Sequence, residues 1–431
     1  MGRTIIRVLA ILLIAAAGAV AQTTSGQITA DETWSGTVTV TGDVIVTSGT
    51  LTISPGTVVK FAMSNDNVVY GGSAAIYLCA MTGGAIQANG DANNRIKFTS
   101  TSLSPSPGSW GKTWAQSDAG ACSFSYCDFE YCKWAHTAEV EVIGSSTTVT
   151  VDNCTVKKSS STAFYASHNN TLTITNTIID DCGKGVFVDG SGPFTITNSV
   201  IANVSSGLII AGRPEGTTQS ATIDHVTMYN VDMMRETSPK WWTGYGIFLT
   251  NTAYTASITN SIFVQSTLAN LKINGWSLTE NNNCWYTGLL GLMNIEDGIP
   301  DATSIEADPL FVDAAASDFR LQCGSPALNA ASDGKNMGWY DGACVATGIA
   351  YGPLAGAGQD INVPNPIMTG DDITFGPTTA LLKVYDMNGQ LVKSLRGTSS
   401  IQWDGTVAPG MYLYSLQLGN SSHTGRLVAA R

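Results

Sequence analysis

The stretch LTITNTIIDDCGKGVFVDGSGPFTITNSVIANVSSGLIIAG, from Leu172 to Gly212, contains nearly the same sequence twice. LTITNTI returns 22 residues later as FTITNSV, and GVFV returns as GLII. Each copy alternates apolar with polar residues, which is typical of short β-strands. A repeat of this length indicates a solenoid, in which successive turns of the chain stack on one another.

The repeat extends in both directions from this stretch. Aligning the copies on the residue that follows IT, or its equivalent, gives Tyr126, Asn153, Asn176, Asn198, His225 and Asn260. The intervals are 27, 23, 22, 27 and 35 residues, so a base period near 22 carries loop insertions. We expect the aliphatic residues Ile174, Ile196, Ile223 and Ile258 to form one dry column, because each strand pairs with its copies in the neighbouring turns. We expect Asn176, Asn198 and Asn260 to stack at a bend and to share amide hydrogen bonds.

The chain has nine cysteines, which permits disulfides if the protein is exported. Cys323 and Cys344 lie 21 residues apart near the end of the repeats, and this position favours a disulfide between them. Cys127 and Cys154 occupy neighbouring turns, either bonded or as small buried apolar side chains. A zinc site is disfavoured because the chain has no C-x-x-C pair and only four histidines.

The N-terminal sequence indicates export, and the net charge disfavours a nucleic-acid partner. Residues 1–21, MGRTIIRVLAILLIAAAGAVA, have two arginines, an apolar run and a small-residue end, which is typical of a cleaved secretory signal. No other segment is apolar and long enough to span a membrane, so we expect no transmembrane segment in the mature chain. The formal net charge is -12, and we expect no nucleic-acid partner because phosphate binding needs a basic surface.

Four stretches together resemble exported right-handed parallel β-helix proteins of the pectate-lyase-like kind. They are residues 33–61, residues 95–114 with FTS and WG, the ITNS repeats, and residues 307–334. The resemblance implies an all-β fold, with a right-handed parallel β-helix over residues 22–346 that ends in a closing segment. The closing segment departs from the family pattern at Cys323 and in YDGACV, which strengthens the expectation of a Cys323–Cys344 bond.

The C-terminal part of the chain has a different pattern. A small, Gly-rich linker over residues 347–360 precedes alternating strands joined by MNG, WDG and APG turns. These turns predict a small β-sandwich over residues 361–431. The order NP, VYDMNGQLV, WDG, PGMYLYSL and GRLVAAR resembles the sorting domain of type IX secretion cargo, which implies the secretion machinery as a partner and a secreted or cell-surface location. An accessory immunoglobulin-like module is the alternative.

Loops inserted between turns are the expected place for function in a solenoid. The longest insertion contains Arg235, Lys240, Trp241 and Trp242, and Trp276 and Trp285 follow one or two turns later. Flat aromatic rings stack on sugars and cations meet carboxylates or hydroxyls, so these six residues are the predicted carbohydrate-binding site. The predicted function is that of a polysaccharide-binding or adhesin-like surface protein.

A polysaccharide lyase or glycoside hydrolase acting on acidic glycans such as pectin is the alternative function. Arg213 or Arg235 would be the base, and Asp180, Asp181 and Asp189 would hold calcium, but no catalytic signature matches these residues. The catalytic residues and the metal ligands are therefore unknown, no cofactor is certain, and calcium is left open. A structural surface spacer is the third hypothesis.

Overall fold

The computed structural model describes residues 22–69, 75–116, 118–139, 146–190, 192–211, 220–232, 240, 243–250, 255–274, 277–286, 295–296, 301–345, 363, 367–386, 390–418 and 421–429. The expected signal segment 1–21 and the expected linker 347–360 lie outside these ranges. The chain divides into two compact units, Met1–Val345 and Ala346–Arg431. Within the described ranges, no helix is long and apolar enough to cross a bilayer.

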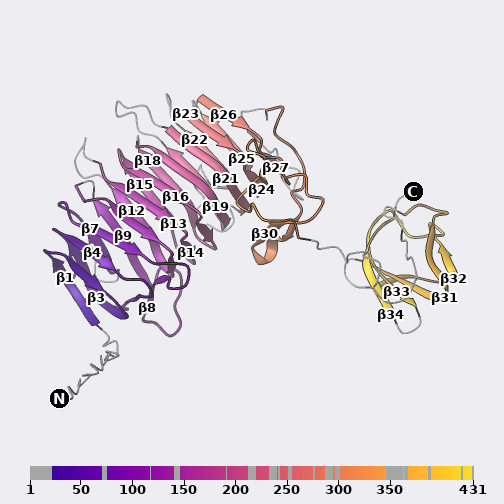
Figure 1. Cartoon of the computed structure of the whole chain (residues 1–431), viewed down its shortest axis with the longest axis horizontal. Coiled ribbons are helices and arrows are strands. Elements are labelled where there is room, and N and C mark those ends of the chain that lie inside the picture. The colour runs from indigo at the N-terminus through magenta and orange to yellow at the C-terminus, as the bar shows by residue number, and fades with distance from the viewer. Residues whose placement is uncertain are drawn as a thin grey trace, which may run out of the picture. The chain divides into compact units, whose positions relative to one another are not determined.

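The larger unit is a parallel β-helix whose turns pass through three stacks of strands in the order B, C, A (Figure 1). Stack A contains β6 (Tyr77–Ala80), β9 (Trp110–Gln116), β12 (Cys132–Glu139), β15 (Thr162–His168), β18 (Lys184–Gly190), β20 (Leu208–Ala211), β22 (Tyr245–Thr250), β25 (Ala269–Asn274) and β28 (Ile295–Glu296). Stack B contains β2 (Glu32–Trp34), β4 (Thr50–Ile53), β7 (Ala85–Asn89), β10 (Cys122–Ser125), β13 (Thr148–Asp152), β16 (Thr171–Thr175), β23 (Thr255–Thr259) and β26 (Ser277–Asn281). Stack C contains β5 (Val58–Phe61), β8 (Ile96–Ser100), β11 (Cys127–Glu130), β14 (Thr155–Lys157), β17 (Ile178–Asp180), β24 (Ile262–Ser266) and β27 (Cys284–Tyr286).

Four longer strands pass through two stacks. They are β1 (Gln22–Ile28) and β3 (Thr37–Val46), shared by stacks C and A, and β19 (Phe194–Val204) and β21 (Ser220–Val231), shared by stacks B and C. The predicted column is confirmed: Ile174 pairs with Ile196, Ile196 with Ile223, and Ile223 with Ile258. All four side chains are fully buried. The repeat is therefore a solenoid as predicted, and its parallel strand pairing is that of the β-helix which the family resemblance implied.

The residues on which the repeats align are the corners between stacks B and C. Tyr126, Asn153, Asn176, Asn198, His225 and Asn260 all have a positive φ, between 47° and 54°. Asparagine tolerates this left-handed conformation better than most residues, which explains why it recurs there. The expected Asn-to-Asn bonds are not formed at this corner. Instead, the amide of Asn176 donates to Asp152 and the amide of Asn260 donates to Asp224, each at 2.8 Å.

A second left-handed corner lies five residues later, between stacks C and A. Its members are Tyr131, Lys158, Asp181, Asn203, Asn230 and Gln265. An amide ladder occurs here: Asn230 Nδ2 donates to Asn203 Oδ1, and Asn203 Nδ2 donates to Asp180 Oδ1, both at 2.7 Å. These bonds join three consecutive turns.

Glycine begins the stack A strands GVFV, GLII and GIFL because the turns approach closely there. A Cβ on Gly185 would lie 2.3 Å from the carbonyl oxygen of Gly207, and one on Gly207 would lie 2.3 Å from that of Gly246. The repeated glycine is therefore a packing requirement of the solenoid.

Cys127 and Cys154 are free and buried, in agreement with the second of the two sequence readings. They belong to a buried ladder in which each side chain accepts a hydrogen bond from the backbone of the turn before it. Cys154 Sγ accepts from Cys127 N at 3.4 Å, Thr177 Oγ1 from Cys154 N at 3.3 Å, and Ser199 Oγ from Thr177 N at 3.1 Å. The ladder satisfies backbone groups that the corner removes from the strand pairing.

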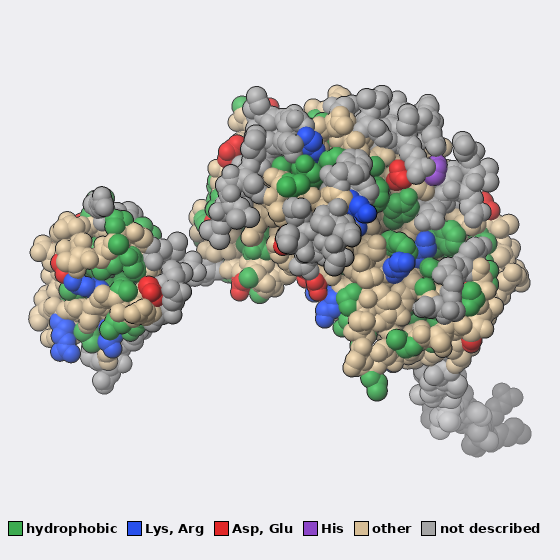
Figure 2. Space-filling view, turned by 180° about the vertical axis from the view of Figure 1, so that it is seen from behind, with side chains coloured by type: hydrophobic (Ala, Val, Ile, Leu, Met, Phe, Trp, Pro, Cys, Tyr) green, Lys and Arg blue, Asp and Glu red, His purple; other side chains and the backbone are tan. Residues whose placement is uncertain are grey.

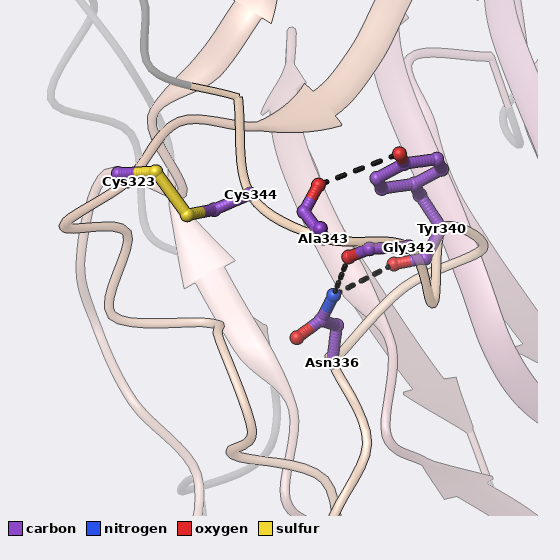
Figure 3. Close-up of a disulfide and its surroundings, with 6 residues drawn as sticks. All are labelled: Cys323, Asn336, Tyr340, Gly342, Ala343 and Cys344. Carbon is purple, nitrogen blue, oxygen red and sulfur yellow. Dashed lines mark hydrogen bonds between the residues drawn. A yellow bond between two sulfur atoms is a disulfide. The ribbon is translucent and has the colours of Figure 1, made fainter.

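The closing segment folds back along the outside of stack C. It contains β29 (Phe311–Asp313), η3 (Ala314–Ala316) and β30 (Asp318–Leu321), and Phe319 packs on Val200 and Ala202. Cys323 and Cys344 are joined by a disulfide in this segment (Figure 3). Beside the disulfide, the Asn336 amide donates to the carbonyl oxygens of Tyr340 at 3.2 Å and Gly342 at 2.9 Å.

The smaller unit contains an antiparallel sheet in the order β32-β31-β33-β34. Its strands are β31 (Asp372–Tyr385), β32 (Leu391–Gln402), β33 (Gly410–Leu418) and β34 (Ser421–Ala429). Phe375, Leu382, Trp403, Leu416 and Leu427 lie in a core of its own. The chain is thus all-β, with a long parallel solenoid and a small C-terminal antiparallel part.

Candidate functional site

The structure describes two of the six residues of the predicted carbohydrate-binding site, Lys240 and Trp285. Arg235, Trp241, Trp242 and Trp276 lie outside the described residues, and so does Arg213. Lys240 is described and exposed, and its backbone N–H donates to Thr243 Oγ1 at 2.7 Å.

The prediction that Trp285 belongs to the carbohydrate-binding site is wrong. Its side chain is fully buried in the solenoid and stacks on Phe263, with ring centroids 4.4 Å apart. Its Nε1 donates to Glu280 Oε1 at 3.0 Å. The ring therefore has no face available to a sugar.

The sequence carried a signal for this burial. Phe263 pairs with Trp285, so NNNCWY is one more copy of the repeat, with Asn282 in the place of Asn260. Asn282 also has the positive φ of the corner residues, at 52°. Extending the 22-residue period by one step would have placed Trp285 in the interior.

The outer face of stack A holds aromatic and lysine side chains that the sequence analysis did not single out. At its N-terminal part, Lys112 Nζ lies 4.7 Å from the ring centroid of Trp114, 4.9 Å from that of Trp134 and 5.9 Å from that of Tyr77. Lys133 Nζ lies 4.7 Å from the centroid of the same Trp134 ring. Lys112 is only 8% exposed, so these cation–π contacts form in a partly desolvated place and are stronger for it.

The aromatic row continues along the same face. The strand register carries it from Trp114 through Thr137 to Tyr165, Phe187, Ile209, Phe248 and Lys272. Tyr165 and Phe187 meet edge to face at 5.5 Å, and Tyr245 lies 5.2 Å from Phe248. We call this set, together with Lys112, Trp134 and Lys184, the stack A face.

Access to the stack A face varies along its length. Ile209 and Phe248 are buried, whereas Trp134, Tyr165, Phe187, Lys184, Tyr245 and Lys272 are half-buried. On the face of the molecule shown in Figure 2, hydrophobic side chains reach the surface in patches, with Lys and Arg side chains among them. Half-buried rings with adjacent cations can stack on a sugar and pair with its carboxylate.

The proposed metal ligands of the lyase hypothesis do not form a cluster. Asp180 accepts hydrogen bonds from Asn203 at 2.7 Å and from Ser317 at 3.4 Å, Asp181 is exposed at a corner, and Asp189 lies on stack A. Among the described residues, no group of three His, Cys, Asp or Glu side chains is arranged to hold a metal ion.

Titratable residues do gather where the closing segment meets a corner. His225 Nδ1 lies 3.0 Å from Asp224 Oδ2, and His225 Nε2 lies 3.6 Å from Asp333 Oδ1. Burial opposes ionisation of Asp224, but hydrogen bonds from His225, Thr259 and Asn260 lower its pKa to about 2. Burial likewise opposes the charge on His225, but the two carboxylates outweigh it and raise its pKa. His225 contacts Asp224 of the solenoid and Asp333 of the closing segment, so these three residues have a structural role in holding the segment in place.

Comparisons with known proteins agree with the fold. The model of the right handed beta helix region matches residues 114–287, and that of the pectate-lyase like beta helix domain matches residues 24–119. The tailspike protein of Acinetobacter phage vB_ApiP_P1 aligns over 90% of this chain and 72% of its own, with 11% identity and a TM-score of 0.26. No curated protein matches the sequence. The chain therefore contains a right-handed parallel β-helix domain of the pectate-lyase-like kind.

Proposed function

We propose that this β-helix protein is exported and binds an acidic polysaccharide along the stack A face, as a glycan-binding or adhesin-like surface protein. The observation that carries the proposal is that half-buried aromatic rings and half-buried lysines share one face. The rings are those of Trp134, Tyr165, Phe187 and Tyr245, and the lysines are Lys184 and Lys272. The strand register spaces these side chains about 4.8 Å apart from turn to turn, so a chain of sugars lying along the solenoid would meet them repeatedly.

The charges favour an acidic glycan over a neutral one. The chain as a whole has a net charge of -12, yet the accessible part of the stack A face contains Lys184 and Lys272. Uronate carboxylates would pair with these ammonium groups, while the apolar faces of the sugar rings would stack on Trp134, Tyr165 and Phe187.

The test measures binding of the full chain to polygalacturonate, alginate and a neutral glucan by affinity electrophoresis. We expect retention by the two acidic polymers, weakened by salt. Lys184→Ala should weaken binding by about 1.5–3 kcal/mol, the contribution of a hydrogen bond to a charged group. Lys157→Ala is the matched control, because Lys157 is an exposed lysine on stack C.

Three outcomes would overturn the proposal or redirect it. Equal loss in Lys157→Ala would show a nonspecific charge effect. Release of unsaturated sugar products that depends on calcium would support the lyase alternative. Absence of both binding and products would leave the structural spacer.

The C-terminal unit is proposed to deliver the protein to the cell surface. Its support is the order of motifs from NP at 365–366 to the terminal GRLVAAR, which resembles that of sorting domains, and its folding around a core of its own.

A further inference from the structure

The outer face of stack B carries a two-dimensional array of hydroxyl groups. Its central row is Thr150, Thr173, Thr195, Thr222, Ser257 and Thr279, each paired with the next by the strand register. A flanking row two residues further along each strand contains Thr175, Thr197 and Thr259. No register shift interrupts stack B between β13 and β26, so the rows are straight. We call this array the stack B face.

Within the described residues, the hydroxyl groups of the central row have no hydrogen-bond partner in the protein. All six residues are exposed or half-buried. Directly beneath them, Ile174, Ile196, Ile223 and Ile258 are fully buried in the close-packed column, which fixes the backbone. The hydroxyls are therefore held in place by the fold and remain available to something outside it.

The side chains of the stack B face do not favour charged ligands or sugars. Over the described strands from β13 to β26, its outward charged side chains are Asp152 and Asp224, on a chain with a net charge of -12. Both carboxylates already accept hydrogen bonds from neighbouring turns, Asp152 from Thr175 and Asp224 from Thr259. These strands present no outward aromatic ring either, and sugars are usually bound by stacking on such rings.

The hydroxyl groups of the array are regularly spaced in two directions, across the turns and along each strand. Neighbouring strands place equivalent hydroxyls about 4.8 Å apart across the turns, and residues two apart along a strand are separated by roughly 6.6 Å. The branched Cβ of threonine restricts its χ1, so its hydroxyl and methyl have few orientations. Ice is a solid whose oxygen atoms donate and accept hydrogen bonds with a repeat close to the strand spacing.

We propose that the stack B face binds ice. Each hydroxyl of the central row takes a lattice position of a surface water molecule, and the methyl groups between them order the adjacent water. One such contact is weak, but the rigid solenoid makes many at once, so their effects combine in the way that multivalent contacts do. This site is separate from the stack A face and does not depend on the proposed binding of polysaccharide.

The test is partition of the fluorescently labelled full chain into a slowly growing ice hemisphere, together with the shape of single ice crystals below the melting point. We expect the chain to enter the ice and to facet the crystals. Thr195→Lys places a long charged side chain at the centre of the array and should abolish both effects. Thr173→Val keeps the shape but removes a hydroxyl, and should reduce both.

Thr101→Lys is the matched control, because Thr101 is an exposed threonine in the loop after β8, outside stack B. It should behave like the unchanged chain, and circular dichroism should show that every variant stays folded. Exclusion of the unchanged chain from ice would overturn the proposal. Equal incorporation of Thr195→Lys and the unchanged chain would also overturn it, because the ice would then be bound elsewhere.

Discussion

At the scale of single residues, His136 is a basic side chain that lies in the apolar interior of the solenoid. His136 is buried on stack A, with its ring 5.0 Å from that of Phe124 and its Nδ1 2.7 Å from Thr113 Oγ1. Burial, and then the charge of Lys112, lower the pKa of His136 to about 3. The unfolded chain binds a proton on this histidine below about pH 6.5, whereas the folded chain does not.

This difference predicts that stability falls as the pH is lowered from 6.5 towards 3. The contribution of His136 to the slope is at most about 1.4 kcal/mol per pH unit. His136→Leu should flatten the dependence of the urea midpoint on pH between 6.5 and 4.5, where most carboxylates do not yet titrate. Parallel slopes for the variant and the unchanged chain would show that the histidine is protonated inside the fold.

Single residues also show what the sequence could predict about the fold. Asn176, Asn198 and Asn260 were found as one column because the same residue type recurs at the left-handed corner. The second corner was missed because its residues share a backbone conformation but no single residue type. They are Tyr131, Lys158, Asp181, Asn203, Asn230 and Gln265. Periodicity detects positions where packing demands one residue type, and this corner accepts several.

At the scale of elements, the closing segment is stabilised by its own covalent link. The Cys323–Cys344 disulfide closes a loop with a sequence separation of 21 residues. Restricting a loop of this length in the unfolded chain stabilises the fold by about 3 kcal/mol. The segment covers Val200 and Ala202 of stack C, so its loss would expose apolar surface of the solenoid.

Reduction is therefore expected to lower the unfolding midpoint and to open residues 301–345 to proteases. The measurement compares thermal unfolding and limited proteolysis with and without a reductant. A Cys323→Ser/Cys344→Ser variant should already be destabilised and should not respond to the reductant. The seven free cysteines are buried and provide no other disulfide for it to act on. An unchanged midpoint on reduction would contradict the expected role of the bond.

The strands of stack A explain why the candidate site could not be located from the sequence. The repeat GVFV and GLII is found in the sequence, but every residue in these two runs other than the glycine is apolar. Such runs lack the alternation that separates an inner from an outer face. The structure assigns Phe187 and Phe248 to the outer face only through their pairing with Tyr165 and Lys272 across the turns.

At the scale of the whole molecule, the three stacks give the solenoid three different outer faces. The stack C face is covered in part by the closing segment, the stack A face carries rings and lysines, and the stack B face carries hydroxyls. One interior column supports all of them, because each turn contributes one strand to each stack. A change of side chain on one face therefore leaves the others in register, which is why the two proposed sites can be tested separately.

The division into two units with separate cores leads to the last prediction, on delivery. A chain that ends at residue 360 keeps the whole solenoid, with its disulfide, and lacks the C-terminal sheet. If the C-terminal unit is the sorting signal, this chain should fold in the periplasm of a host with type IX secretion and stay there, while the full chain reaches the surface. Residues 347–431 fused to a soluble reporter should carry the reporter outward. Surface display of the shortened chain would assign delivery to the solenoid, since the truncation removes nothing that its core requires.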